Sequence, residues 1–319
     1  MPHASAFDLL QLQIIFGDRL KERVPLARYT AARVGGLADA LISVNSRDEL
    51  VDVVGRLWNL DVPFQIIGGG SNLLVSDAGV RELIIYNRAR QVKFDEISHT
   101  PTVKAESGAN IGLIARQAAA KGLAGLEWAA GIPGTVGGAV VGNAGAHGRD
   151  ISGSLLVAEI LHQDLKGDNK QGGMHPLVEE WPVHRFEFEY RSSILKHQKS
   201  EMVVLSVVFC LQRSNSKEVQ RKIQEFVAFR QQTQPPGASM GSMFKNPPGD
   251  YAGRLIEAAD LKGTRVGGAE ISPRHANFFI NHGDATSMDI KQLIDLARRE
   301  VAERFGVELE LEIELLGEW

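Results

Sequence analysis

The sequence predicts an α+β protein with a larger N-terminal part and a C-terminal α+β part. Three observations support this prediction. Segments typical of strands and helices alternate from about residue 28, and the pattern changes near Ser214. The chain has 319 residues, enough for two or three domains of about 100–150 residues each.

In the N-terminal part, short apolar runs alternate with longer amphipathic ones. Ser46 followed by Glu49 is a capping-box signature for the start of a helix. The run 201–212 (EMVVLSVVFCLQ) is apolar on both faces, which predicts a central strand of a sheet. We expect helices over residues 46–60 and 110–125, and strands over residues 39–44, 62–67, 81–87, 156–164 and 201–212.

In the C-terminal part, two helices and a terminal strand are predicted. The segment 216–229 places Val219, Ile223, Phe226 and Val227 on one helical face. Residues 286–306 repeat apolar side chains at helical spacing. Strict alternation over 307–317 (VELELEIELLG) predicts a strand.

Composition narrows the class of protein. Thirty-five basic residues against 39 acidic ones give a net charge of -4, which argues against nucleic acid as the main partner. The single cysteine, Cys210, excludes an internal disulfide and fits a small buried hydrophobe better than a reactive thiol. No signal peptide and no apolar run of about 18 residues occur, so we expect a cytoplasmic protein without a membrane partner.

Two glycine-rich loops carry the first chemical signal. Residues 66–77 (IIGGGSNLLVSD) lead a strand into three glycines, whose backbone N–H groups can converge on an anion. Neither a dinucleotide fingerprint nor a P-loop is present, and alone this loop could be a tight turn. Residues 131–148 (GIPGTVGGAVVGNAGAHG) are denser in glycine still. Two such loops favour a dinucleotide-sized cofactor.

These loops resemble the FAD-binding domain of the UDP-N-acetylenolpyruvoylglucosamine reductase (MurB) family. Further resemblances lie in YTAARVGG (29–36), similar to the family's opening strand, YRSSILK (190–196) and GSMFKNP (241–247). KGTRVGGAEISPRHANFFIN (262–281) and FGVELELEIELLG at the C-terminus also fit, so the resemblance runs from about residue 24 to 317.

The resemblance implies a vanillyl-alcohol-oxidase/PCMH-type FAD-binding fold of two subdomains, followed by an α+β substrate-binding domain. The corresponding boundaries are 1–90, 91–213 and 214–319. It implies non-covalent FAD, with NADPH as co-substrate. The implied flavin-binding residues are Arg33, Gly68, Gly69, Gly70, Ser71, Asn72, Leu73, Gly131, Ile132, Pro133, Gly134, Thr135, Gly137, Gly138, Asn143, Ala144 and Gly145.

The family reaction reduces the enolpyruvyl ether of a UDP sugar to UDP-N-acetylmuramate in peptidoglycan precursor synthesis. Ser242 has no adjacent base in the sequence that would make it a nucleophile. The resemblance implies that it is the proton donor of the reaction. Arg191 matches the arginine that stabilises the substrate carboxylate and enolate, although a surface ion pair is the alternative. Glu312 matches the family's glutamate. A shift of two residues would select Glu310, because four glutamates share one face of the expected strand.

For the UDP sugar, the resemblance implies contacts from Tyr190, Ser193, Lys245 and Asn246, while Lys245 could instead be a solvated surface side chain. No protein partner is implied. His275 and His282 lack metal-ligand spacing, so we expect no metal. The chain departs from the family at His147, often a tyrosine, and at Thr233–Gln234, where some members carry a lysine. It resembles the short subclass without the tyrosine-bearing insertion.

Two other functions fit parts of the sequence. A flavin-dependent oxidase or dehydrogenase of the same fold would carry similar N-terminal loops, but it would not need GSMFKNP together with the C-terminal glutamate. A non-catalytic flavin- or nucleotide-sugar-binding protein is the third hypothesis. The presence of Arg191, Ser242 and Glu312 together argues against it.

Overall fold

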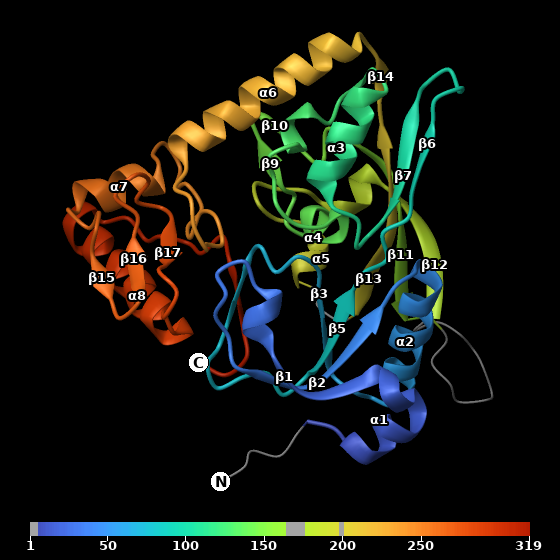
Figure 1. Cartoon of the computed structure of the whole chain (residues 1–319), viewed down its shortest axis with the longest axis horizontal. Helices are drawn as coiled ribbons and strands as arrows, with labels where there is room; N and C mark the ends of the chain where they lie inside the picture. The colour runs from blue at the N-terminus through green and yellow to red at the C-terminus, as the bar shows by residue number, and fades with distance from the viewer. Residues whose placement is uncertain (1–5, 164–175, 198–200) are drawn as a thin grey trace. The chain divides into compact units, whose positions relative to one another are not determined.

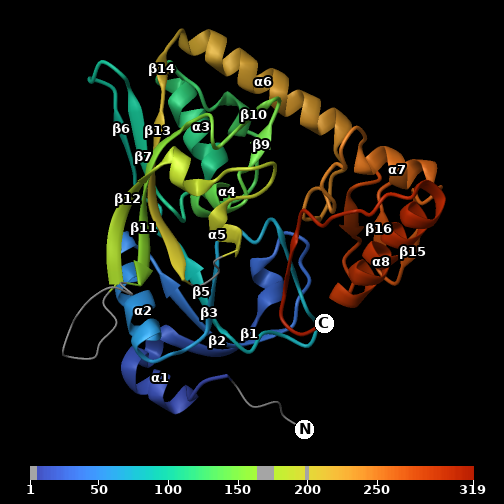
Figure 2. The same cartoon turned by 180° about the vertical axis from the view of Figure 1, so that it is seen from behind.

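A computed structural model describes residues 6–163, 176–197 and 201–319, and its α+β content confirms the predicted fold class (Figures 1 and 2). The chain forms two compact units. The first unit contains residues 1–21, 40–68 and 82–228, and the second contains 22–39, 69–81 and 229–319. The division into three domains stays a prediction.

The first unit contains strands that pair in parallel. In the four-stranded sheet the order is β1 (Leu20–Pro25), β2 (Leu37–Val44), β5 (Leu83–Asn87), β3 (Phe64–Ile67). Both β2 and β3 run parallel to β5. Helix α2 (Arg47–Asn59) makes the crossover between β2 and β3. Its buried Leu50, Val53 and Leu57 pack in one core with helix α1 (Leu9–Phe16).

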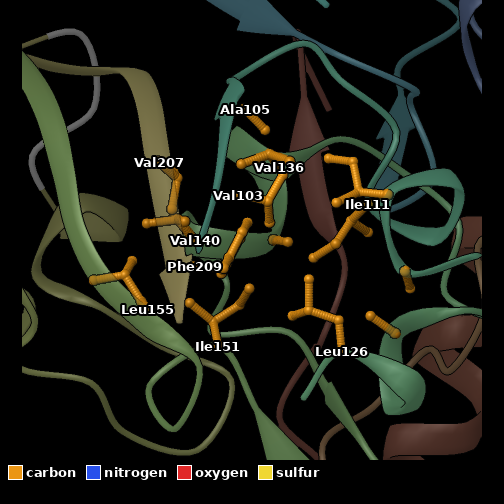
Figure 3. Close-up of a cluster of buried hydrophobic side chains, with 14 of the residues drawn as sticks. Val103, Ala105, Ile111, Leu126, Val136, Val140, Ile151, Leu155, Val207 and Phe209 are labelled. Carbon is orange, nitrogen blue, oxygen red and sulfur yellow. The ribbon is translucent and has the colours of Figure 1, made fainter. Parts of the chain in front are cut away.

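A five-stranded antiparallel sheet also lies in the first unit. Its order is β12 (Pro176–Pro182), β11 (Leu155–Gln163), β13 (Met202–Cys210), β7 (Thr102–Glu106), β6 (Val92–Asp95). Strand β13 is central, as its two apolar faces predicted. The predicted last residue of β11, Asp164, lies outside the described residues. Helices α3 (Ile111–Ala120) and α4 (Val136–Val141) contribute to the core with β7, β11 and β13 (Figure 3).

The second unit combines two helices with small sheets. Strands β15 (Arg265–Val266), β16 (Ala269–Ile271) and β17 (Phe279–Asn281) form an antiparallel sheet beside α7 (Ala252–Ala258) and α8 (Ser287–Phe305). Strand β4 (Leu73–Val75) pairs in parallel with β18 (Glu314–Leu316). The chain passes from the first unit to the second within the predicted helix α6 (Ser216–Thr233).

The remaining elements are short connections. They are η1 (Gly17–Arg19), η2 (Leu26–Tyr29), β8 (Leu123–Ala124) paired with β14 (Gln212–Arg213), η3 (Glu127–Ala129), β9 (Gly145–Ala146) paired with β10 (Arg149–Asp150), η4 (Val183–Phe186) and α5 (Ile194–His197). In the described part of the chain, no helix combines the length and apolar character that crossing a membrane requires.

Three local predictions need correction. The Ser46 hydroxyl accepts from the Glu49 N–H, but the Glu49 carboxylate accepts from the N–H of Asn45, so the expected reciprocal box is incomplete. Residues 26–29 form a 3₁₀ helix, 31–32 a turn and 33–36 an irregular segment, where the resemblance implied a strand over 29–36. At the C-terminus only Glu314–Leu316 is a strand, because the chain bends at residues 312–313.

The bend changes the position of the four glutamates. Glu308 and Glu310 are exposed, whereas Glu312 and Glu314 are partly buried. They therefore do not share one solvated face, which the alternation alone had suggested. Backbone pairing of residues 310–312 with the Ser242 region overrides the strand pattern of this segment.

Candidate active site

The two glycine-rich loops meet in the first unit. A Cβ placed on Gly68, at the end of β3, would lie 2.3 Å from the hydroxyl oxygen of Thr135 in the second loop. No side chain other than hydrogen fits at Gly68, so the glycine allows the loops to touch. This contact places the end of β3 directly against the second glycine-rich loop.

The same close packing explains other glycines of these loops. A Cβ on Gly137 would lie 3.0 Å from the Ser107 Cβ, and one on Gly145 would lie 2.7 Å from the carbonyl oxygen of Arg149. At these positions the glycine is required by the protein's own backbone and side chains. Gly138 differs, because it is exposed and a Cβ there would meet only Thr135 Oγ1 at 3.6 Å. A ligand can approach the backbone at Gly138.

The YRSS segment is tied to the second glycine-rich loop by three hydrogen bonds. The Arg191 guanidinium donates to the Gly145 carbonyl at 2.9 Å. The Asn143 amide donates to the Glu189 carbonyl at 2.9 Å, and the buried Ser193 hydroxyl donates to the Val141 carbonyl at 2.7 Å. The predicted flavin-binding loop and the predicted catalytic arginine therefore form one local structure. Because the Ser193 hydroxyl already donates to the Val141 carbonyl, a role in holding the loop fits it better than a contact with substrate.

Backbone strain is concentrated in this region. Arg191, Asn143 and His147 have φ values of 58°, 40° and 54°, in the left-handed region that disfavours residues with a Cβ. Such residues persist where the surroundings hold them, and they cluster at functional sites. The Arg191 guanidinium also lies over the ring of Tyr190 at 5.5 Å, and Tyr190 is 54% exposed. An exposed aromatic ring beside a fixed guanidinium is available to a ligand.

In the second unit, the first glycine-rich loop continues beside Arg33. The N–H of Ala31 donates to the Gly70 carbonyl at 2.9 Å. A Cβ on Gly70 would lie 1.9 Å from the Tyr29 carbonyl oxygen, so only glycine fits there. Arg33 itself is exposed and has a φ of 58°. A strained, exposed arginine next to a glycine loop is suited to an anionic ligand.

Asn72 connects this loop to the C-terminal glutamate. Its side-chain amide donates to the Glu312 carbonyl at 3.0 Å, and the N–H of Glu314 donates to the Asn72 carbonyl at 2.9 Å. The N–H of Glu312 in turn donates to the carbonyl of Met243 at 2.8 Å. Residues 72, 312 and 243 thus form a continuous chain of contacts. It brings the predicted flavin loop, Glu312 and the neighbour of Ser242 together.

The GSMFKNP motif begins with a left-handed glycine, and Ser242 and Phe244 form backbone bridges with other segments. Gly241 has a φ of 80°, and Ser242 is partly buried. Lys245 Nζ lies 2.5 Å from Glu310 Oε1, and the lysine side chain is only 15% exposed. Lys245 is therefore not the freely solvated lysine of the alternative interpretation. Asn246 is exposed, and its Oδ1 accepts from the N–H of Ala252 at 3.1 Å, at the start of α7.

The remaining predicted flavin residues lie on the same loops. Most of them are partly buried, and Gly69 and Pro133 are exposed. Gly134 has a φ of 110°, which requires glycine. The partly buried residues are Ser71, Leu73, Gly131, Ile132, Gly134 and Ala144.

Three histidines contact neighbouring groups of the protein. Burial lowers the pKa of His275, and the nearby Lys262 lowers it further. The His275 Nδ1 accepts from the N–H of Asn277 at 3.3 Å. His282 contacts Glu270 at 2.5 Å, and the ring of His147 stacks on Phe226 with centroids 3.9 Å apart. Among the residues that the structure describes, no group of three or more His, Cys, Asp or Glu is placed to hold a metal.

One residue of this region was missed by the sequence analysis. Asn277 is 3% exposed, and its side chain makes two hydrogen bonds to the backbone of Phe244. An asparagine inside the apolar run HANFFIN was the available signal, since a buried amide needs partners.

Comparison with known proteins identifies the family of this chain. Residues 38–160 match the family model of the FAD binding domain, and residues 231–316 match the C-terminal domain of UDP-N-acetylenolpyruvoylglucosamine reductase. A curated UDP-N-acetylenolpyruvoylglucosamine reductase of Chloroflexus aggregans is 43% identical over 93% of this chain and 97% of its own length. The chain belongs to the UDP-N-acetylenolpyruvoylglucosamine reductase family.

Other members of the UDP-N-acetylenolpyruvoylglucosamine reductase family agree. The enzyme of Rubrobacter xylanophilus is 44% identical over 92% of this chain and 94% of its own. The crystal structure of MurB from Thermus caldophilus matches with a TM-score of 0.75 at 35% identity, covering 93% of this chain and 99% of that one. Membership confirms the predicted FAD-dependent oxidoreductase class and the predicted type of fold.

Proposed function

We propose that this protein reduces UDP-N-acetylglucosamine enolpyruvate to UDP-N-acetylmuramate, with NADPH as reductant, in peptidoglycan precursor synthesis. One observation carries the proposal. In each unit, a predicted flavin loop is hydrogen-bonded to a predicted catalytic segment: Gly145 to Arg191 in the first unit, and Asn72 to Glu312 in the second. A cytoplasmic location is part of the same proposal.

The glycine-rich loops are proposed to hold FAD. In the first unit the contact of Gly68 with Thr135 supports one surface over residues 131–138 and 143–145, where Gly138 leaves the backbone open. In the second unit Arg33 and residues 69–73 supply a cation and loop N–H groups for the anionic part of the cofactor. When bound, FAD supplies the hydride that is added to the terminal carbon of the enolpyruvyl group.

The other roles belong to side chains of the chain itself. Addition of hydride leaves negative charge on the carbon beside the carboxylate, so that carbon needs a proton. We assign this proton to the hydroxyl of Ser242. This residue is partly buried, and its backbone forms a bridge with Phe278. Together the hydride and the proton saturate the double bond.

Charge stabilisation falls to Arg191 and Glu312. The guanidinium of Arg191 is held by Gly145 and stays charged, which suits the substrate carboxylate and the developing enolate. Glu312 is proposed to orient the enol or relay its proton. The exposure of Glu310 and its pairing with Lys245 favour Glu312 over Glu310 for this role.

The UDP moiety is assigned to the remaining polar groups. The ion pair with Glu310 restricts the Lys245 ammonium group. We assign this ammonium group to a phosphate of the UDP moiety. Asn246 is exposed, and Tyr190 offers an exposed ring beside Arg191. Ser193 supports the loop through Val141.

A direct experiment tests this function. The purified protein is examined for a flavin absorption spectrum, and NADPH oxidation is followed with and without UDP-N-acetylglucosamine enolpyruvate. We expect bound flavin and oxidation that depends on the UDP sugar. Flavin without substrate-dependent turnover would favour an oxidase or dehydrogenase of another substrate. Absence of flavin after reconstitution would contradict both.

A further inference from the structure

The Ser242 segment, residues 242–245, is held along both of its edges. On one edge, the N–H of Glu312 donates to the Met243 carbonyl at 2.8 Å, and the N–H of Lys245 donates to the Glu310 carbonyl at 2.9 Å. On the other edge, the N–H of Met243 donates to the Asn277 carbonyl at 2.8 Å, and Ser242 forms a bridge with Phe278. The backbone that carries the Ser242 side chain is therefore held from both sides.

One side chain contributes to this arrangement from within the core. Asn277 Oδ1 accepts from the N–H of Phe244 at 2.9 Å, and Asn277 Nδ2 donates to the Phe244 carbonyl at 2.8 Å. All these atoms are buried, and Asn277 is 3% exposed. The amide satisfies both polar groups of one peptide residue, so it fixes the position and the rotation of the backbone there.

We propose that Asn277 is a positioning residue for proton delivery by Ser242. This inference rests on the proposed function. Phe244 is two residues from Ser242 and belongs to the same segment, so a shift at Phe244 is transmitted along the backbone to the hydroxyl. Displacement of a catalytic group by about 1 Å can cost on the order of a hundredfold in rate. Asn277 touches no reacting atom in this scheme and acts through the segment.

The test separates the two half-reactions. Asn277→Ala and the uncharged polar variant Asn277→Ser, which loses the amide but leaves a small hydroxyl, are studied in anaerobic single turnovers. We expect flavin content and flavin reduction by NADPH to stay within about twofold of the unmodified protein. Reoxidation of the reduced flavin by the UDP sugar should slow about 10- to 100-fold in Asn277→Ala, and by no more than this in Asn277→Ser.

A double-mutant cycle distinguishes positioning from general loss of structure. On a Ser242→Ala background, Asn277→Ala should slow reoxidation by less than about threefold, because the group that it positions is already absent. Leu293→Ala, a buried core change in α8 of the same unit, is the stability-matched control. Its effect on reoxidation should be small and the same on both backgrounds.

The outcomes distinguish failure of the proposed function from failure of the positioning role of Asn277. If the unmodified protein shows no reoxidation by the UDP sugar, the proposed function is wrong and the inference fails with it. If it turns over normally but Asn277→Ala reoxidises at the unmodified rate, only the positioning role is wrong. The positioning role is also wrong if Asn277→Ala slows reoxidation by the same factor in the unmodified protein and on the Ser242→Ala background. Should Asn277→Ala not fold, the same comparisons are made with Asn277→Ser.

Discussion

At the scale of single residues, the proposed role of Ser242 rests on the backbone contacts that hold its segment and not on a partner base. Gly241, with its φ of 80°, turns the chain, and the following residues are bonded to Glu312 and Asn277. A hydroxyl is a weak acid, but it is adequate for a strongly basic carbanion when its position is fixed. Fixed geometry is what the backbone contacts on both edges supply.

Replacement of Ser242 tests the proton-donor role. Ser242→Ala should leave flavin reduction by NADPH within about twofold and slow product formation by about 10²- to 10⁴-fold, the usual contribution of a general acid. Stopped-flow measurement of the two half-reactions checks this. An equal fall in both half-reactions would show that Ser242 supports structure or cofactor binding instead.

At the scale of elements, the long periodic segments were predictable and the short ones were not. Helices α2, α6 and α8 and the central strand β13 overlap their predicted ranges, because each has a periodic apolar face that packs in a core. Helix α3 was also predicted, but it ends at Ala120 and not at Gly125, since residues 123–124 form β8. Strands β6, β7 and β12 and helix α1 were not predicted. The residues 307–313 look like a strand but are drawn into pairing with the Ser242 segment.

The first glycine-rich loop gives a prediction at this scale. Gly70→Ala would place its Cβ 1.9 Å from the Tyr29 carbonyl oxygen at a φ of 57°, so we expect a loss of about 2–4 kcal/mol in unfolding free energy. Gly263→Ala is the matched control, with a φ of 76° and no atom within 4 Å of the added Cβ. It should cost about 1 kcal/mol from backbone strain alone. Urea unfolding measures both, and equal losses would refute the steric explanation.

At the scale of the whole molecule, each unit is assembled from distant parts of the chain. The core of the second unit includes Ala32, Val34 and Leu74 as well as residues after 240. Strand β18 pairs with β4, which lies more than 200 residues earlier in the sequence. Packing of the C-terminal part therefore depends on residues 22–39 and 69–81.

A truncation tests this dependence. The fragment 214–319, the predicted third domain, lacks part of its core and the partner of β18. We expect the fragment to unfold without cooperativity in urea and to be cleaved rapidly by proteases. The full chain should unfold cooperatively and be cleaved slowly. Cooperative unfolding of the fragment would instead support the predicted boundary at residue 214 as a folding boundary.

Stability should also depend on pH through Glu159. Partial burial acts to raise its pKa, but the hydrogen bond from the Ser206 hydroxyl and the charges of Lys104 and Arg47 outweigh burial and hold the pKa below 4.5. Because the folded state has the lower pKa, this stabilisation is present above about pH 4.5 and is lost as pH falls through the folded value. Glu159→Gln should lower the unfolding free energy at pH 7 and flatten its decline in acid. Urea titrations across this range measure it, and an unchanged slope would contradict the assignment.

The sequence alone was enough to predict the family, which the comparisons confirm, and to propose the flavin loops and the catalytic residues, because glycine spacing and polar motifs are local features that keep their order along the chain. It could not decide between Glu310 and Glu312, nor identify Asn277, because both depend on contacts between segments at least 30 residues apart. Only the tertiary structure pairs residue 243 with 277 and 312, and residue 72 with 312. Backbone hydrogen bonds between distant segments leave no periodic trace in a sequence, yet they set where each functional side chain lies.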